Sequence, residues 1–176
     1  PVHNVPYIVI GARPRIRAIL MTVGTHPHRG AERVRVQVIM LKDDISSKDG
    51  GFQMCFADSN QGTASANYFN DNYKGKKVGI FYKADDDYSV GIKNNFVANL
   101  DASFGTVVEA PFTGDATVFD SQVNLLKDCD VIFMPIYYTP ASEFMSQGAT
   151  TVKANAIYYG CDGLDGIDAI EGFDVN

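Results

Sequence analysis

Between residues 60 and 160 the chain alternates short apolar runs with longer segments in which apolar side chains recur at every third or fourth position. The short runs are typical of buried strands, and the periodic segments are typical of helices with one face on a core. Strands are expected at 77–82, 107–112, 131–137 and 156–159. Helices are expected at 61–73, from an acidic start at 85–87 to a stop at Gly105, around 119–126, and from Pro140 onward.

Strict alternation of strands and helices restricts the fold because the crossover connections it implies are almost always right-handed. Such connections build a mostly parallel sheet with helices on both faces. We therefore predict an α/β fold, a three-layer Rossmann-like lobe. A chain of 176 residues is long enough to bury a core of this kind without disulfides or metals.

Polar and aromatic side chains follow three of the predicted strands. Tyr88 comes after the strand at 77–82, and Asp162 follows the strand at 156–159. Tyr137 ends the run at 131–137, and Tyr138 is the next residue. The loops after parallel strands share one edge of the sheet, and open α/β sheets hold their ligands there. Ring faces, hydroxyls and a carboxylate together suit a small organic molecule with a positive amine.

Each of these residues also has a purely structural interpretation. Tyr88 could pack on a helix face, Tyr137 and Tyr138 could be ordinary sheet-edge aromatics, and Asp162 could be the N-cap of a helix that includes Leu164. The acidic run at 85–87 is expected to be a solvated helix start.

The first 44 residues differ from the rest of the chain. They carry seven Lys or Arg against three acidic residues, whereas residues 45–176 carry eight Lys against eighteen acidic residues. Strands are expected at 5–10 and 33–41, and 16–23 is ambiguous. The asymmetry fits either a basic nucleic-acid-binding arm or a leader unrelated to the body, and the acidic body argues against nucleic acid. We expect residues 1–44 and 45–176 to be separate domains.

The sequence contains no motif that supports catalysis or a cofactor. Phosphate-loop, dinucleotide-turn, nucleophile-elbow and zinc-protease strings are absent. His26 and His28 lie in an expected loop without a nearby carboxylate or cysteine pair, so they predict no metal site. No apolar run approaches the roughly 20 residues of a membrane-spanning helix. We expect no enzyme, no cofactor and no metal.

Several strings together resemble the type I substrate-binding proteins of ABC transporters, specifically the branched-chain amino acid (Leu/Ile/Val-binding) class. The matching strings are FQMCFADSNQG at 52–62, VGIFYK at 78–83 with DYSVG at 87–91, FTGD at 112–115, FMPIYYTP at 133–140, GCDG at 160–163 and EGFD at 171–174. Their order and spacing agree with the family over residues 45–176. Proteins of that class close two Rossmann-like lobes over an amino acid, and this stretch is similar to much of the second lobe.

The resemblance implies a role for each candidate residue. Tyr88 falls where the family has a cleft-lining tyrosine, and one of Tyr137 and Tyr138 falls on a ligand-contacting aromatic. Asp162 falls on the acid that pairs with the ligand's α-ammonium group. The resemblance further implies an ABC permease as partner and a periplasmic or extracellular, membrane-associated location, although no export signal is visible.

The first lobe of that family grips the α-carboxylate with serine, threonine and backbone amides, and residues 1–44 do not resemble it. We therefore expect residues 45–176 to form an incomplete lobe with reduced affinity for the ligand. The favoured hypothesis is a solute-binding component, or a fragment of one, for an amino acid or similar amine. The alternative is a single-lobe interaction module that binds no ligand and forms a homodimer through the face of the missing lobe.

Overall fold

The computed structural model describes residues 8–9, 19–22, 36–39 and 57–170, and it divides into two compact units, Pro1–Ser59 and Asn60–Asn176. The first unit contains strands β1 (Ile8–Val9), β2 (Ile19–Thr22) and β3 (Val36–Ile39), which form an antiparallel sheet in that order. These strands fall inside the three N-terminal segments considered above, including the ambiguous one at 16–23. His26 and His28 lie outside the described residues.

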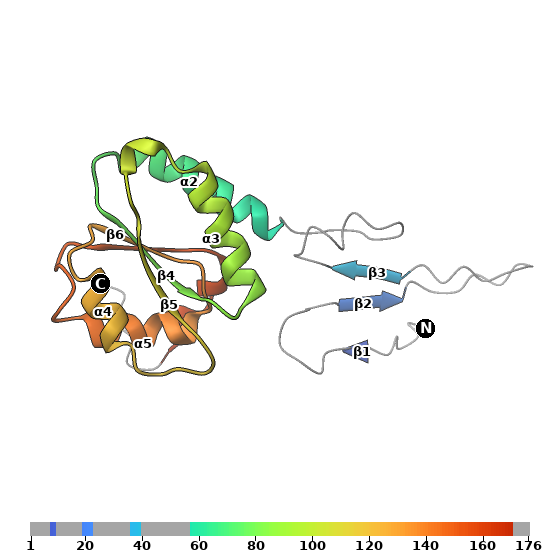
Figure 1. Cartoon of the computed structure of the whole chain (residues 1–176). Coiled ribbons are helices and arrows are strands. Elements are labelled where there is room, and N and C mark those ends of the chain that lie inside the picture. The colour runs from blue at the N-terminus through green and yellow to red at the C-terminus, as the bar shows by residue number, and fades with distance from the viewer. Residues whose placement is uncertain (1–7, 10–18, 23–35, 40–56, 171–176) are drawn as a thin grey trace, which may run out of the picture. The chain divides into compact units, whose positions relative to one another are not determined.

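The second unit is an α/β lobe with a four-stranded sheet that is parallel throughout (Figure 1). Its strand order is β5-β4-β6-β7, which confirms the predicted fold class. The elements in chain order are α2 (Asp58–Asn72), β4 (Val78–Lys83), α3 (Asp87–Asn99), η1 (Ala102–Phe104), β5 (Val108–Phe112), α4 (Asp120–Leu126), β6 (Val131–Met134), α5 (Tyr138–Gly148), β7 (Ile157–Gly160), η2 (Asp162–Leu164) and η3 (Ile167–Ala169).

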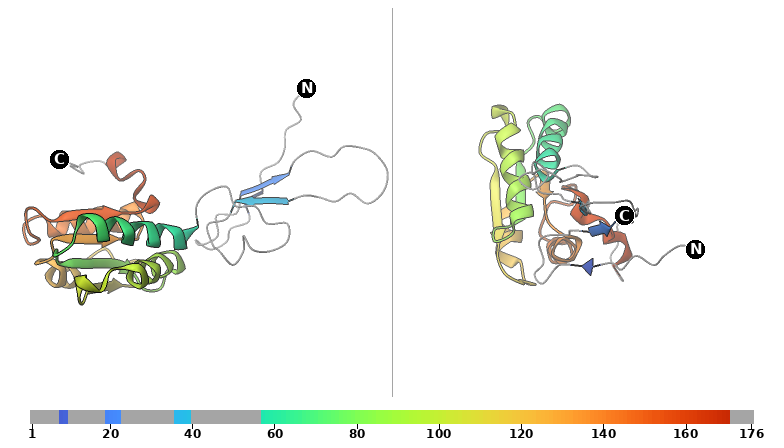
Figure 2. Two further views of the ribbon diagram at one scale, coloured as in Figure 1. Left: turned by 90° about the horizontal axis from the view of Figure 1, so that it is seen from above. Right: turned by 90° about the vertical axis from the view of Figure 1, so that its right-hand side faces the viewer.

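Helices α2 and α3 cover one face of this sheet, and α4 and α5 cover the other (Figure 2). A hydrophobic core lies under each pair of helices. Neighbouring residues of one strand supply both cores: Ile80 packs in the first and Phe81 in the second. In the first core the ring of Phe133 lies 4.3 Å from that of Phe96, and in the second the ring of Phe81 stacks 4.3 Å from that of Phe144. Cores on both faces explain why the central strands are continuously apolar.

Helices α2 and α3 approach closely at Gly62. A Cβ atom built on Gly62 would lie 2.4 Å from the backbone oxygen of Ile92 and 2.9 Å from the backbone nitrogen of Phe96. Only a residue without a side chain allows this contact. This close contact with α3 places the first turn of α2 next to the loop after β7.

Several predicted boundaries are wrong in detail. Helix α2 begins at Asp58 rather than at Gln61. Helix α3 ends at Asn99 rather than at Gly105, because Leu100 is already extended; Gly105, with φ of 66°, ends the short helix η1. Strand β6 ends at Met134, where the backbone N–H of Ile136 bonds back to the Met134 oxygen at 2.9 Å. Phe119 is the N-cap of α4, and the helix begins after it.

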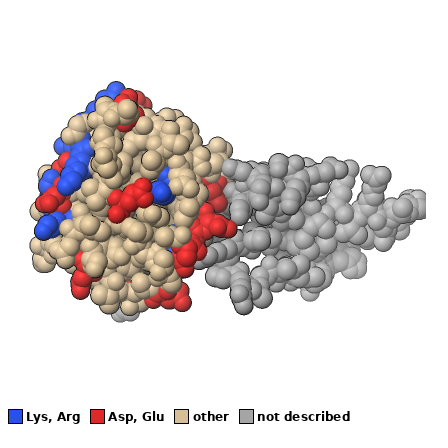
Figure 3. Space-filling view, in the orientation of Figure 1, with Lys and Arg blue, Asp and Glu red and all other residues tan. Residues whose placement is uncertain are grey.

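Charged side chains of both signs lie close together on part of the visible surface of the second unit (Figure 3). Within the ranges that the structure describes, no helix combines the length and apolarity needed to cross a bilayer.

Candidate ligand-binding site

The candidate residues follow the carboxyl ends of β4, β6 and β7, which are neighbours in the sheet. Tyr88 lies in the first turn of α3, Tyr137 is the N-cap of α5, and Tyr138 is the first residue of α5. Asp162 begins η2 directly after β7 and Cys161. The parallel topology therefore gathers four residues that are far apart in the sequence at one edge of the sheet.

Tyr88 and Asp162 are joined by a short hydrogen bond. The Tyr88 hydroxyl donates to Oδ1 of Asp162 at 2.6 Å and accepts from the backbone N–H of Gly163 at 3.0 Å. Burial, and then the hydrogen bond to the Asp162 carboxylate, raise the pKa of Tyr88 far above its ordinary value, so the hydroxyl remains a neutral donor. The Asp162 side chain is exposed, and its Oδ2 has no hydrogen bond to a described residue.

Two sequence-based interpretations are resolved by this geometry. Cys161, not Asp162, is the N-cap of η2, so the N-cap interpretation of Asp162 is wrong; its side chain bonds to Tyr88 instead. Tyr88 does pack in a helix-face core, with 8% of its surface exposed, and it reaches Asp162 as well.

The two neighbouring tyrosines are arranged differently. The ring of Tyr137 stacks on that of Tyr88, with centroids 5.1 Å apart and planes 21° apart, while 44% of Tyr137 remains exposed. Tyr138 is 42% exposed and makes no ring contact with a described residue. The structure thus brings Tyr88, Tyr137 and Asp162 together in one cluster, with Tyr138 beside it along the chain.

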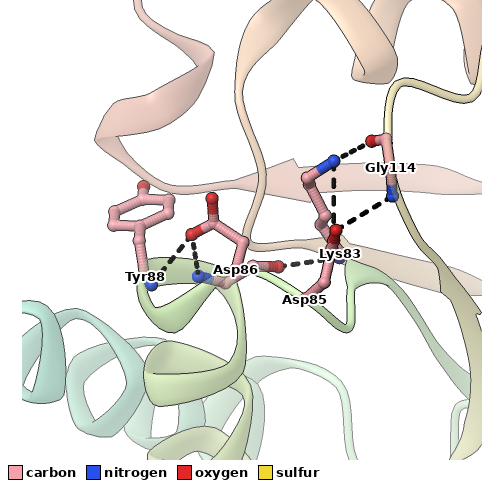
Figure 4. Close-up of polar contacts among 6 residues, drawn as sticks. Lys83, Asp85, Asp86, Tyr88 and Gly114 are labelled. Carbon is pink, nitrogen blue, oxygen red and sulfur yellow. Dashed lines mark hydrogen bonds and ion pairs between the residues drawn. The ribbon is translucent and has the colours of Figure 1, made fainter. Parts of the chain in front are cut away.

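Asp86 holds the backbone that presents Tyr88. As the N-cap of α3, its carboxylate accepts from the backbone N–H groups of Tyr88 at 2.9 Å and Ser89 at 3.3 Å (Figure 4). Asp86 is only 5% exposed, so the prediction that residues 85–87 form a solvated helix start is wrong at this position. The Ser89 hydroxyl in turn accepts from the backbone N–H of Lys83 at 2.9 Å.

A second set of contacts ties the loop after β4 to the loop after β5 (Figure 4). Gly114 donates its backbone N–H to Oδ2 of Asp85 at 3.0 Å, and the Lys83 ammonium donates to the Gly114 oxygen. Lys83 also lies 3.5 Å from Oδ1 of Asp85. The Gly114 backbone bond and the nearby Lys83 lower the pKa of Asp85, although burial opposes them. These contacts brace the start of α3.

Gln61, in the first turn of α2, is a site neighbour that the sequence analysis missed. Its Oε1 accepts from the backbone N–H of Asp162 at 3.2 Å, and the residue is 8% exposed. Its Nε2 is buried and has no hydrogen-bond partner among the described residues. A buried donor without an acceptor destabilises a fold by about 1–3 kcal/mol, whereas a typical hydrogen bond stabilises it by about 0.5–1.5 kcal/mol. The one sequence signal at this residue is its place near the end of the matching string at 52–62.

No protein-family model matches the chain, and no curated protein matches it either. Solved structures do match. A leucine-binding protein, LivK, from Thermotoga maritima has 25% sequence identity and a TM-score of 0.61, over 69% of this chain and 35% of that one. LivJ from Streptococcus pneumoniae, a branched-chain amino acid transporter substrate-binding protein in complex with isoleucine, has 28% identity and a TM-score of 0.60 over the same shares.

A third similar structure, at 19% identity, is an ABC transporter solute-binding protein from R. palustris in complex with benzoate. Its TM-score is 0.58, over 73% of this chain and 36% of that one, and it supports the fold alone. The second unit has the fold of a type I periplasmic-binding-protein lobe and resembles the branched-chain amino acid class, as predicted. The chain spans about a third of the length of these proteins.

Proposed function

We propose that the second unit is a ligand-binding lobe of an ABC transporter's solute-binding component. Its ligand is an amino acid or a similar small amine, held at the carboxyl ends of β4, β6 and β7. The observation that carries the proposal is the exposed Asp162 carboxylate, whose Oδ1 is held by Tyr88 at 2.6 Å. The remaining oxygen, Oδ2, is free of hydrogen bonds to the described residues and can accept from an ammonium group.

The chemistry at this edge favours a cation over an anion. A carboxylate accepts hydrogen bonds and donates none, so Asp162 repels a ligand carboxylate and attracts an ammonium group through a charge-assisted hydrogen bond. The exposed ring of Tyr137, which stacks on buried Tyr88, and the exposed ring of Tyr138 offer apolar faces to the ligand's side chain. Tyr88, Tyr137, Tyr138 and Asp162 are therefore the proposed ligand-binding residues.

The partner and location follow from the same similarity. Two of the similar structures are proteins of branched-chain amino acid transport or leucine binding. We therefore propose an ABC permease as the partner of the full-length protein, and a periplasmic or extracellular, membrane-associated location. We propose no catalytic activity.

The test is a titration of the full 176-residue chain with three probes. Binding is monitored through the NMR chemical shifts of the backbone amides, which detect weak binding. The probes are leucine, isopentylamine, which lacks the carboxylate, and 4-methylpentanoate, which lacks the amine. The proposal expects leucine and isopentylamine to shift Asp162 and Gly163, and 4-methylpentanoate to leave them unchanged. Equal responses to all three probes, or no response to either amine, would refute amine binding by this chain.

Two variants identify the contact. Asp162→Asn should weaken leucine binding roughly 10- to 100-fold, since a hydrogen bond to a charged group contributes about 1.5–3 kcal/mol. Asp165→Asn is the matched control because Asp165 is an exposed acid in the same loop, and it removes the same charge. If both variants weaken binding equally, general charge attraction explains the affinity.

The alternative proposal is a single-lobe interaction module that binds no ligand and forms a homodimer through the face of the missing lobe. It predicts a homodimer in light scattering whose proportion falls when exposed Tyr137 or Tyr138 is replaced by a lysine. A monomer at all accessible concentrations contradicts it.

A further inference from the structure

Gln61 connects helix α2 to the loop that carries Asp162, across 101 positions of sequence. Its Oε1 faces the backbone N–H of Asp162, and because a backbone N–H can only donate, this contact also fixes which end of the carboxamide is oxygen. Two further hydrogen bonds join this loop to Tyr88. The Gly163 N–H donates to the Tyr88 hydroxyl, and the hydroxyl donates to the Asp162 side chain. Gln61 and Tyr88 therefore hold the same loop from two helices.

The contact is not explained by folding stability. Gln61 is 8% exposed and leaves Nε2 without a partner among the described residues, so the destabilisation from this unpaired donor offsets the stabilisation from its one neutral hydrogen bond. The hydrogen bond from the Asp162 N–H is only partly buried and Asp162 is an exposed residue, so water can replace Gln61 as the acceptor of this N–H. A methionine of similar size would remove the unpaired donor and keep the packing. Residues that break a local rule in this way tend to lie at functional sites.

We propose that Gln61 is a positioning residue for the ligand-binding carboxylate. By holding the Asp162 backbone, it sets the register of the loop so that Oδ1 meets the Tyr88 hydroxyl and Oδ2 faces the ligand side. The inference rests on the proposed function only in that Asp162 is the acceptor of the ligand's amine. Its structural half, control of the Tyr88–Asp162 contact, is independent of any ligand.

The test compares Gln61→Met with Ser65→Ala in the full chain. Ser65 is the matched control because it is another buried polar residue of α2, one turn further along. The first measurement is thermal unfolding, in which Gln61→Met should be as stable as the unmodified chain or more stable. The second is the NMR signal of the Tyr88 ring carbon that bears the hydroxyl, assigned by its loss in Tyr88→Phe. Gln61→Met should move this signal, and Ser65→Ala should not.

The outcomes separate positioning from simple packing. A lower unfolding temperature with an unmoved Tyr88 signal would identify Gln61 as a packing residue and overturn the proposal, and so would unchanged stability with an unmoved signal. Gln61→Leu serves as the second variant if Gln61→Met does not fold. Leucine affinity should fall roughly two- to tenfold in Gln61→Met, the equivalent of one neutral hydrogen bond. If leucine binds to no variant, the proposed function fails, while the Tyr88 signal still decides the role of Gln61.

Discussion

Replacing Gly163 by alanine is the sharpest perturbation of the candidate site. A Cβ atom at this position would lie 2.5 Å from the backbone oxygen of Ile136 and 2.8 Å from the Tyr88 hydroxyl. Both distances are shorter than real Cβ contacts allow. The Ile136 backbone is held by its hydrogen bond to Met134, and Tyr88 is buried and stacked on Tyr137, so neither neighbour moves freely. The loop that carries Asp162 must therefore move.

The movement breaks the hydrogen bond from the Gly163 N–H to Tyr88 at 3.0 Å, and it strains the bond from Tyr88 to Asp162 at 2.6 Å. Overpacking of this kind costs about 1–3 kcal/mol. For a unit the size of Asn60–Asn176, that corresponds to a fall in the unfolding temperature of roughly 3–12 °C. Because the loop is partly exposed, part of the strain is relieved by displacement, and the effect on ligand binding should exceed the effect on stability.

Gly91→Ala is the matched control because Gly91 lies within α3 and a Cβ atom added there would have nothing within 4 Å. Alanine there should raise stability by about 0.8–1 kcal/mol, since glycine is a poor helix former. Urea unfolding gives both free energies, and the Tyr88 ring-carbon signal reports the site. A Gly163→Ala variant with unchanged stability and an unmoved Tyr88 signal would refute the close-contact argument.

Three further predictions concern the scaffold. Asp86→Ala should lower the free energy of unfolding by about 0.5–2 kcal/mol through loss of the α3 N-cap, whereas Asp86→Asn, which can still cap, should lower it less in urea titrations; equal losses would contradict capping. The pKa of Asp130 is lowered from its ordinary value of 3.8 by a hydrogen bond from the Lys77 backbone N–H and by the Lys153 ammonium. The contribution of Asp130 to folding stability is therefore complete above pH 3.8 and is lost as the pH falls through the folded-state pKa. Asp130→Asn should therefore be less stable at neutral pH and lose less stability on acidification, and parallel urea-midpoint curves against pH would disprove this. Burial raises the pKa of the Cys129 thiol, and Cys129 is 0% exposed. In a Cys55→Ser variant, a thiol reagent should therefore modify Cys161 first and Cys129 only after unfolding. Equal modification rates of the two thiols in mass spectrometry would contradict this.

The fold was predictable because its signals are local. Each central strand packs against helices on both faces, so its residues form a continuous apolar run in the sequence. Ile80 and Phe81 are neighbours in such a run and pack in different cores. Element ends were less predictable. Leu100 continues the apolar period of α3 but has an extended backbone, because the chain turns there into η1 to reach β5. Periodicity reports which face a residue occupies and does not report where the backbone hydrogen bonds stop.

The candidate site was predictable only in part. Parallel topology alone places Tyr88 and Asp162 at one edge, and the structure joins them at 2.6 Å. The choice between Tyr137 and Tyr138 depends on the direction of one turn after β6, which no pattern encodes, and it is Tyr137 that stacks on Tyr88. Gln61 was missed because it binds the backbone N–H of Asp162 and not its side chain. Any residue type can supply a backbone N–H except proline, so the contact leaves no signal in the sequence of its partner.

Tyr88 explains how an exposed carboxylate can keep one orientation without a ligand. Its ring is buried with Ile92 and Phe96 in the core under α2 and α3, so its hydroxyl is fixed by the packing of the lobe. The hydroxyl stays protonated because burial and the Asp162 bond raise its pKa, so it remains a hydrogen-bond donor to Asp162. Ordering a free side chain on binding costs about 0.5–1.5 kcal/mol. The Asp162 side chain is already ordered in the folded protein by its bond to Tyr88, so binding does not incur this cost. The carboxylate that we propose as the acceptor of a ligand's amine is thus linked through Tyr88 to the core under α2 and α3. Changes in the packing of α3 should alter the Tyr88–Asp162 hydrogen bond before they unfold the lobe.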